Sequence, residues 1–229
     1  MLYNRKAWKH VFKLDPAKSL TADEIDRVCQ SGTDAIVVGG TDNVTLEGVL
    51  DLMSHIRDHQ IPCVLEVSTV DAITPGFDFY DIPVVLNSQE KKWLIDIQHQ
   101  AVKAYGQMIN WNEITTEGYV ILNPKAKAYQ LTNCQLPDDK EVIAYAQMAE
   151  HMFRLPVLYL EYSGRYGDPE LVKKVKQELN NTQLVYGGGI TNLSQAETMA
   201  QYADTIVVGN SLYTNFEEAL ETVNVIKDR

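Results

Sequence analysis

Two glycine-rich turns near the end of the chain have the composition of an anion site. Gly187-Gly188-Gly189 ends the apolar run at 183–189, and Gly209-Asn210 ends the run at 205–210. Glycine lets backbone N–H groups approach an anion closely, and a helix starting after the turn adds a favourable dipole. Glycines here could also serve tight turns alone. Because both turns follow neighbouring runs, we interpret Gly189, Gly209 and Asn210 as candidate phosphate-binding residues.

A cation and two oxygen donors follow the first two apolar runs. Lys13 and Asp15 are two residues apart, so on a strand their side chains share a face. The carboxylate of Asp15 and the hydroxyl of Thr41 are hard ligands of the kind that hold Mg²⁺ through a diphosphate. A Lys13–Asp15 ion pair, with Thr41 as a helix cap, explains the same residues. The spacing therefore indicates either a Mg²⁺ site or an ion pair.

Glu161 is a carboxylate in the otherwise apolar run at 156–162. A buried glutamate needs hydrogen-bond partners. It could accept the hydroxyls of a polyol substrate, act as a base, or pair with a neighbouring strand. Glu66 and Asn123 occupy similar positions and are less informative. We expect no histidine cluster, because His10 precedes the first run and the other histidines fall in helical stretches.

These residues follow a repeated alternation of strands and helices. Short runs rich in Val, Ile, Leu and Tyr alternate with longer amphipathic stretches, which is typical of successive βα units around a parallel sheet. We count eight runs, at residues 11–15, 34–40, 62–67, 83–87, 118–123, 156–162, 183–189 and 205–210. The pattern predicts one domain over 1–229, an α/β fold of the (βα)8 TIM-barrel class with the candidate site at the carboxyl ends of the strands.

Helix signals fill most of the intervals between these runs. Apolar residues with helical spacing at 46–56 and 216–226 predict core-facing stripes on two of the helices. Asp168-Pro169, Asn192 and Thr214-Asn215 mark three helix starts.

The third βα unit departs from the pattern. Only 15 residues separate Val67 from Pro83, and they include Pro75-Gly76, so we expect a reduced or missing third helix. The gap would leave an apolar notch, either a binding groove or a surface covered by a partner subunit. The next helix would line it with a stripe that is small toward its end, formed by Leu94, Ile97, Ala101 and Ala104.

Composition excludes several classes of protein. Lys plus Arg is 20 against 31 Asp plus Glu, and the net charge of −11 argues against nucleic acid as a partner. The three cysteines are odd in number and lack CxxC spacing, which indicates neither a disulfide framework nor a thiolate metal site and fits a reducing cytoplasm. No apolar stretch reaches the ~18 to 20 residues of a membrane span. We therefore expect a soluble cytoplasmic protein.

Motifs at seven of the strand ends resemble those of one enzyme family. They are WKHVFKLDP, AIVVGGTD, VLEVS, PGFDFY with VVLNS, LYLEYSG, YGGGI and DTIVVGNSLY. Together they resemble the glycerol-1-phosphate prenyltransferases, and are most similar to the bacterial heptaprenylglyceryl phosphate synthases, with the archaeal geranylgeranylglyceryl phosphate synthases more distant. The resemblance covers nearly the whole chain.

The resemblance implies a TIM-barrel enzyme that moves a long isoprenyl group, such as heptaprenyl, from its diphosphate to the C3 hydroxyl of sn-glycerol 1-phosphate. Pyrophosphate is released with the help of Mg²⁺. By motif, Lys13 contacts glycerol 1-phosphate, and Asp15 and Thr41 bind the metal. The glycerol moiety is held by Tyr159, Leu160, Glu161, Tyr162, Ser163 and Gly164, and its phosphate by Gly189, Gly209 and Asn210. A homodimer and transient contact with a membrane surface, where the lipid product would go, are expected.

The reaction type sets what the site must do. An allylic carbocation is so electrophilic that a nearby hydroxyl needs positioning more than activation. We therefore interpret Glu161 as an orienting group rather than an essential strong base. The long loop from Pro124 to Pro137 carries Lys125 and Lys127, and its length suggests a lid over the catalytic face.

Two other interpretations remain open. Phosphate-binding barrels of histidine, tryptophan or thiamine biosynthesis share the glycine turns, although the histidine-type barrels would favour an acidic residue where Asn123 stands. A non-catalytic binder of a phosphorylated ligand is the third possibility. The candidate metal ligands beside the glycine turns argue against it.

Overall fold

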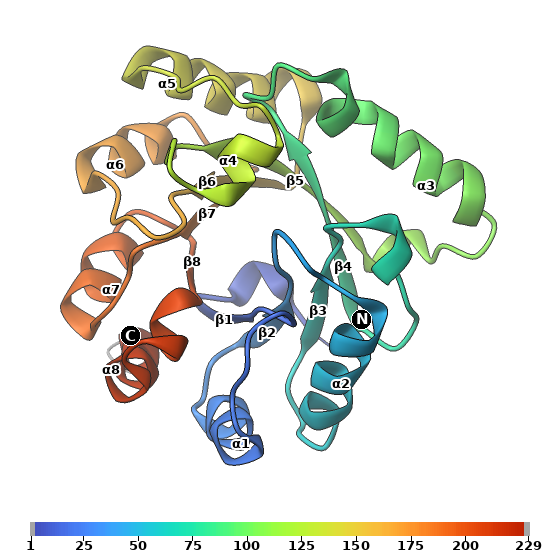
Figure 1. Cartoon of the computed structure of the whole chain (residues 1–229). Helices are drawn as coiled ribbons and strands as arrows, with labels where there is room; N and C mark the ends of the chain where they lie inside the picture. Colours follow the sequence, from blue (N-terminus) through green and yellow to red (C-terminus); the bar gives the residue numbers. More distant parts are fainter. Residues whose placement is uncertain (1–2, 227–229) are drawn as a thin grey trace.

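A computed structural model describes residues 3–226 and contains a closed barrel of eight parallel strands (Figure 1). Each strand pairs with its neighbours in sequence, and β8 closes the barrel against β1. The strands are β1 (His10–Leu14), β2 (Ala35–Val38), β3 (Cys63–Glu66), β4 (Phe79–Val85), β5 (Ile114–Ile121), β6 (Val157–Glu161), β7 (Gln183–Gly187) and β8 (Thr205–Val208). All eight predicted strands are present, and the TIM-barrel prediction is confirmed.

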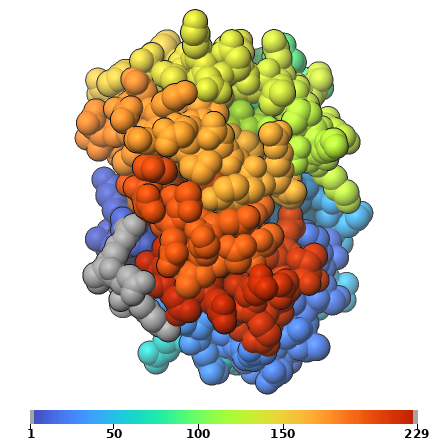
Figure 2. Space-filling view, turned by 90° about the vertical axis from the view of Figure 1, so that its left-hand side faces the viewer, coloured from blue at the N-terminus to red at the C-terminus, as the bar shows by residue number. Residues whose placement is uncertain are grey.

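Helices cover the outside of the barrel, and Figure 2 shows the C-terminal third of the chain forming one continuous side. They are α1 (Ala22–Gln30), α2 (Leu46–Arg57), α3 (Ile97–Tyr105), α4 (Lys127–Leu131), α5 (Asp139–Gln147), α6 (Pro169–Gln177), α7 (Leu193–Ala200) and α8 (Phe216–Glu221). Shorter helical turns include η1 (Arg5–Ala7), η2 (Val70–Ala72), η3 (Lys92–Asp96), η4 (Trp111–Glu113), η5 (Met148–Phe153), η6 (Asn210–Tyr213) and η7 (Thr222–Ile226). Within 3–226, no helix is long and apolar enough to cross a membrane.

Side-chain capping starts two of the helices where the sequence predicts it. The Asp168 carboxylate accepts the N–H of Glu170, with Pro169 as the first helical residue of α6. The Asn192 side chain accepts the N–H of Gln195 at the start of α7. Asn215 precedes α8 but makes no side-chain cap.

The third unit is reduced, as predicted: η2 is a three-residue 3₁₀ turn. Ala72 and Phe77 are buried and fill part of the gap. The predicted start of strand β4 at Pro83 is wrong, because the strand begins at Phe79. Pro83 lies beyond the residues that pair with β3 and is registered only with β5, so its missing N–H interrupts no ladder on the β3 side.

The predicted stripe on α2 is only partly buried. Val49 and Ile56 are fully buried, but Leu46 and Leu50 are exposed. The third unit supplies one helical turn beside α2, so less surface is available to cover this helix. His10 also differs from the prediction: it is the first residue of β1 and fully buried, with one ring nitrogen 2.9 Å from the Thr33 hydroxyl and the other 2.9 Å from the Thr222 hydroxyl.

Helix α3 stands out from the rest of the outer ring. It has no buried residue, whereas α1, α2 and α5 through α8 each have at least one. Of its predicted stripe, Leu94, Ile97 and Ala101 are partly buried and Ala104 is exposed. Helix α3 is therefore packed less tightly than its neighbours, and only the first three stripe residues remain candidates for lining a groove.

Strand alternation divides the buried side chains into two layers. One layer packs between the strands and the helices, with residues such as Phe12, Leu160 and Tyr186. The other fills the barrel interior, with apolar residues such as Val64 and Val185. Charged side chains also enter the interior, and they form the site described next.

Candidate active site at the barrel mouth

Lys13 points from β1 into the barrel and bonds to Glu66 of β3. Its ammonium nitrogen lies 2.6 Å from Oε1 and 2.8 Å from Oε2 of that carboxylate. Burial alone would lower the pKa of Lys13, but the nearby carboxylates of Glu66 and Glu161 outweigh it and raise the pKa. Lys13 is therefore a cation at neutral pH. Its partner is Glu66, so the simple Lys13–Asp15 pair considered above does not form.

Glu161 ends β6 as a buried carboxylate beside this cation. It accepts the backbone N–H of Ser163. Burial raises the pKa of Glu161 to about 7, although the charge of Lys13 opposes the shift. Near physiological pH, Glu161 is therefore present both as a neutral acid and as a carboxylate, and the carboxylate is the form that best accepts substrate hydroxyls.

An aromatic stack lies between these groups. The rings of Tyr119 and Tyr159 are 4.4 Å apart at 12°, and the hydroxyl of Tyr119 donates to Oε2 of Glu66. The Tyr159 hydroxyl lies so near Gly187 that a Cβ at Gly187 would be 2.0 Å from it. Glycine at that position is thus required for Tyr159 to point inward.

Not every residue of the predicted glycerol-binding stretch 159–164 faces the site. Tyr159 belongs to the interior layer. The side chains of Leu160 and Tyr162 pack in the outer layer, so these two residues can reach the site only through their backbone atoms. The physical reason is the two-residue period of a strand, which sends alternate side chains to opposite faces. Gly164, at φ +78, has open space around it.

The glycine turns after β7 and β8 adopt conformations that side chains would prevent. Gly188 and Gly189 have φ values of +125 and +67, and a Cβ at Gly189 would be 2.1 Å from the backbone nitrogen of Tyr166. A Cβ at Gly209 would lie 3.2 Å from the backbone oxygen of Lys13. The turn after β7 thus packs against the loop after β6, and the turn after β8 packs against β1, which allows these backbones to form an anion cradle.

Asn210 stands at the rim of this cradle. Its side-chain oxygen accepts a hydrogen bond of 2.8 Å from the Lys18 ammonium. Lys18 therefore adds a positive charge near the predicted phosphate position. The sequence analysis did not select Lys18, because its position after the Asp15-Pro16 turn gives no periodic signal.

Asp15 lies against the turn that carries Thr41. Its Oδ1 accepts the N–H of Ala17, and a Cβ on Gly40 would be 2.4 Å from that oxygen. Its Oδ2 lies 3.7 Å from the ammonium of Lys18. One carboxylate oxygen thus has a single distant partner, beside a hydroxyl-bearing loop.

The loop after β5 extends over the mouth and contains α4 (Figure 1). From this loop Lys127 forms an ion pair of 2.8 Å with Asp42, which belongs to the loop after β2. Near the other end of the loop, the Ser88 hydroxyl donates to the backbone oxygen of Thr132. The loop therefore spans the mouth from both sides, in the place expected for a lid.

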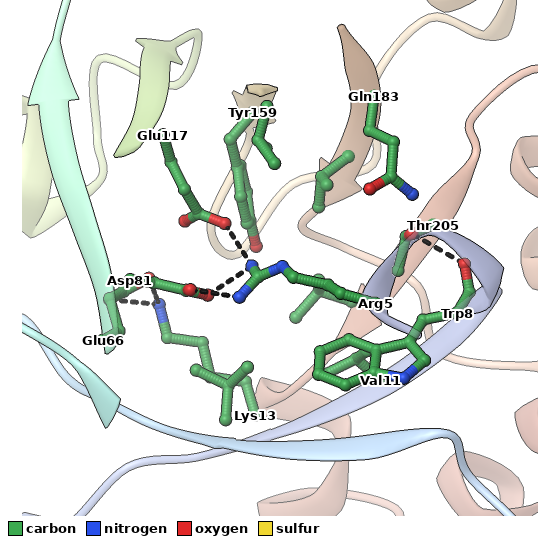
Figure 3. A pocket seen from close by; sticks show the side chains of 14 residues that line it. Arg5, Trp8, Val11, Lys13, Glu66, Asp81, Glu117, Tyr159, Gln183 and Thr205 are labelled. Carbon is green, nitrogen blue, oxygen red and sulfur yellow. Dashed lines mark hydrogen bonds and ion pairs between the residues drawn. The ribbon is translucent and has the colours of Figure 1, made fainter. Parts of the chain in front are cut away.

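The opposite end of the barrel holds a charged cluster that the sequence analysis missed. Arg5 enters from η1 and pairs with Asp81 of β4 and, at 2.8 Å, with Glu117 of β5 (Figure 3). Burial raises the pKa of Glu117 well above its usual range, and Asp81 adds to the shift. A cavity of about 30 Å³ lies between this cluster and Lys13. Side chains two residues apart on a strand share a face, so counting back from Tyr119 would have identified Glu117 as another inward-facing residue.

Comparison with known proteins accounts for these features together. The model of the PcrB family matches residues 3–227. The chain belongs to the PcrB family. A heptaprenylglyceryl phosphate synthase of Oceanobacillus iheyensis is 60% identical over 225 residues, covering 98% of each chain. The family resemblance seen in the sequence is confirmed.

Solved structures agree with this assignment. An (S)-3-O-geranylgeranylglyceryl phosphate synthase of Thermoplasma acidophilum, in complex with sn-glycerol-1-phosphate, has a TM-score of 0.85 and 26% identity, over 98% of this chain and 95% of that one. A thiamine phosphate pyrophosphorylase of Pyrococcus furiosus has a TM-score of 0.63 at 14% identity, over 98% of each chain, and shares the fold alone. The PcrB-family chain is thus much more similar to a prenyl-lipid synthase than to the thiamine-type barrel.

We predict that the rate of this enzyme rises with pH through about 7 and that Glu161→Gln removes this dependence. The pKa of Glu161 is raised to about 7, so its carboxylate forms only as the pH passes that value. Glutamine accepts hydrogen bonds at every pH but takes no proton, and kcat/KM should fall by about 10- to 100-fold, below the usual range for loss of an acid–base group.

The measurement is kcat/KM from pH 5.5 to 9 for both proteins. The raised pKa also means that ionising Glu161 costs folding stability as pH rises from about 4.5 to 7. Glu161→Gln should therefore raise the melting temperature at pH 8 and leave it nearly unchanged at pH 4.5. An identical pH–rate profile in both proteins would remove Glu161 from the titrating step.

Proposed function

We propose that this chain is a heptaprenylglyceryl phosphate synthase, which transfers a C35 prenyl group from its diphosphate to the C3 hydroxyl of sn-glycerol 1-phosphate. The observation that carries the proposal is the placement of Lys13 and Glu161 beside the glycine turns after β7 and β8. An anion cradle, a cation and a hydroxyl acceptor in one place fit a phosphorylated triol. The high identity to enzymes of this name supports the same conclusion.

In this proposal the phosphate of the acceptor lies on the backbone at Gly189, Gly209 and Asn210. Lys13 contributes its charge from below, and Glu161 accepts the glycerol hydroxyls, which orients the C3 hydroxyl toward the prenyl carbon. The backbone at Ser163 and Gly164 bounds the same space, since the N–H of Ser163 already holds Glu161. Positioning of this kind supplies most of what an electrophilic allylic centre needs.

Mg²⁺ is the proposed cofactor, and the residues present fit it. Asp15 offers a carboxylate oxygen with only one distant partner, and Thr41 offers a hydroxyl on the adjoining loop. Among the described residues no three acidic, histidine or cysteine side chains converge on one point. Mg²⁺ commonly takes one or two protein oxygens and completes its shell with phosphates and water, so this donor set suits it. When bound, the ion would stabilise negative charge on the departing diphosphate.

We assign the lid and the outer groove to the binding of the prenyl diphosphate donor. Lys127 and Lys125 on the loop over the mouth would meet the diphosphate of the prenyl donor. A 35-carbon tail is far too long for the barrel, so we place it outside, along the loosely packed side of α3 where Leu94, Ile97 and Ala101 are partly buried. Transient contact with a membrane surface would let the lipid product leave. The unpaired, buried cysteines fit a cytoplasmic location.

Asp15→Ala should abolish turnover and leave the fold intact. Its carboxylate is the one acidic metal ligand of the proposal and belongs to a turn rather than to the core. The assay mixes sn-glycerol 1-phosphate, heptaprenyl diphosphate and Mg²⁺, and measures radiolabelled glycerol phosphate in an organic extract. Wild-type protein should form product, and chelation of Mg²⁺ should stop it.

One control variant keeps this test specific. Asp26→Ala removes an exposed carboxylate of α1 on the outer ring and should leave the rate unchanged. Absence of product from the wild-type protein under these conditions would reject the proposed function. Mg²⁺-dependent activity of Asp15→Ala within a few-fold of wild type would remove Asp15 from the site.

Ala101→Trp should shorten the preferred donor to about C20. Ala101 is partly buried, so an indole there would occupy the groove and deny burial to the distal prenyl units, at ~0.8 kcal/mol per excluded CH₂. Ala104→Trp is the matched control, because Ala104 is exposed and its indole would extend into solvent. The readout is the ratio of kcat/KM for C20 and C35 donors. An unchanged ratio in folded Ala101→Trp would place the tail elsewhere.

The exposed apolar residues near α3 support a homodimer. Four exposed apolar residues lie within 95–111: Met108, Trp111, Ile95 and Val102 are 76%, 59%, 55% and 43% exposed. Exposed apolar side chains are typical of interaction surfaces where they form a patch. We place the second copy on this surface. Trp111→Glu should convert a dimer into a monomer in size-exclusion chromatography with light scattering, whereas Leu50→Glu on α2 should not. A wild-type monomer, or a dimer in both variants, would contradict this assignment.

A further inference from the structure

Glu66 has no task in the proposed reaction, yet it is one of the most constrained side chains of the barrel. It ends β3, is 8% exposed, and both of its oxygens bond to the ammonium of Lys13 at 2.6 and 2.8 Å. An ammonium group has three donors. Glu66 holds the ammonium from one side, which leaves at least one donor free on the side away from Glu66.

Residues from three other strands of the barrel hold the Glu66 carboxylate in this position. From β5, the Tyr119 hydroxyl donates to its Oε2. Tyr119 is itself held by its stack on Tyr159 of β6. At the end of β2, the absence of a side chain at Gly39 makes room, since a Cβ there would lie 2.8 Å from Cβ and 3.1 Å from Oε1 of Glu66. The position of the Glu66 carboxylate is therefore set by contacts that do not involve Lys13.

We propose that Glu66 is the positioning residue that aims the free donor of Lys13 at the phosphate of the acceptor and keeps Lys13 from pairing with Glu161. The inference rests on the proposed function, since it takes glycerol 1-phosphate as the ligand. After Glu66, the carboxylate that acts most on Lys13 is Glu161. Without Glu66, the ammonium would turn to Glu161 and occupy the acceptor of the glycerol hydroxyls.

The surroundings separate this role from simple charge balance. The charged and titratable groups near Glu66 are Lys13 of β1, Glu117 and Tyr119 of β5, and Tyr159 and Glu161 of β6. A residue needed only to balance charge could be replaced by any of these carboxylates. A residue that orients the ammonium of Lys13 cannot be replaced in this way. Among residues 3–226, only Glu66 contacts this ammonium with both carboxylate oxygens.

The test compares Glu66→Gln with Glu117→Gln. Both remove one buried carboxylate next to a cation inside the same barrel, but Glu117 pairs with Arg5 at the far end. Calorimetry gives the Kd of sn-glycerol 1-phosphate for each protein, and steady-state kinetics gives KM for both substrates. Glu66→Gln should raise Kd and KM for glycerol 1-phosphate about tenfold or more, the scale of a lost buried charge contact. KM for the prenyl diphosphate should stay within about twofold.

Glu117→Gln should leave all three values within about twofold of wild type, because burial already favours the neutral form of Glu117. A folded Glu66→Gln with unchanged Kd would overturn the proposal. So would an equal rise of both KM values, because general structural damage has no preference for one substrate.

Gly39→Ala provides a second variant that keeps every charge. Its methyl group would push Glu66 away from Lys13 and should produce the same selective loss of glycerol 1-phosphate binding. If Glu66→Gln does not fold, Gly39→Ala decides the question: an unchanged Kd overturns the proposal, as does failure of both variants to fold. A wild-type protein that binds glycerol 1-phosphate without forming lipid would reject the proposed function, and the calorimetric comparison would still decide the role of Glu66.

Discussion

The charge enclosed in the barrel is the constraint on which the rest of the site depends. Four carboxylates, those of Glu66, Asp81, Glu117 and Glu161, share the interior with two cations, Arg5 and Lys13. Burying an unpaired charge costs several kcal/mol. Burial raises the pKa of Glu117 well above its usual range and that of Glu161 to about 7, and the resulting tendency to bind a proton lowers the excess negative charge.

The two ends of the barrel hold these charges in different ways. At the floor, Arg5 brings the N-terminal segment into the barrel and satisfies Asp81 and Glu117. At the mouth, Lys13 is bonded to Glu66 and not to Glu161, which instead accepts the backbone N–H of Ser163. The carboxylate of Glu161 thus has no bonded cation, and it lies at the end of the barrel where the glycine turns are found.

Glycine residues and the shortened third βα unit shape the site and its surroundings. Two of the polar side chains in the interior have room because a nearby strand end carries a glycine, Gly187 beside Tyr159 and Gly39 beside Glu66. On the outside, the loss of the third helix leaves α2 and α3 less covered than the other helices. In the proposed function, the polar acceptor would bind inside the barrel mouth and the long apolar donor would lie outside the barrel.

The sequence by itself determined the barrel, the shortened third unit and the glycine turns. These depend on local patterns: consecutive apolar residues predict strands buried on both faces, and glycine or proline limits the backbone wherever it stands. The carboxylate in β6 could be selected as well, because Glu161 interrupts an apolar run. The motif resemblance then supplied the assignment of these positions to one kind of site.

Tertiary structure alone decided the partners. No pattern along the chain indicates that Lys13 bonds to Glu66, 53 residues away, or that Arg5 enters the floor to meet Glu117, 112 residues away. Leu160 and Tyr162 belong to the predicted stretch by sequence, but strand alternation turns them to the helices. The pKa of Glu161 also follows from the closed barrel, because desolvation and the charge of Lys13 arise only when distant strands meet.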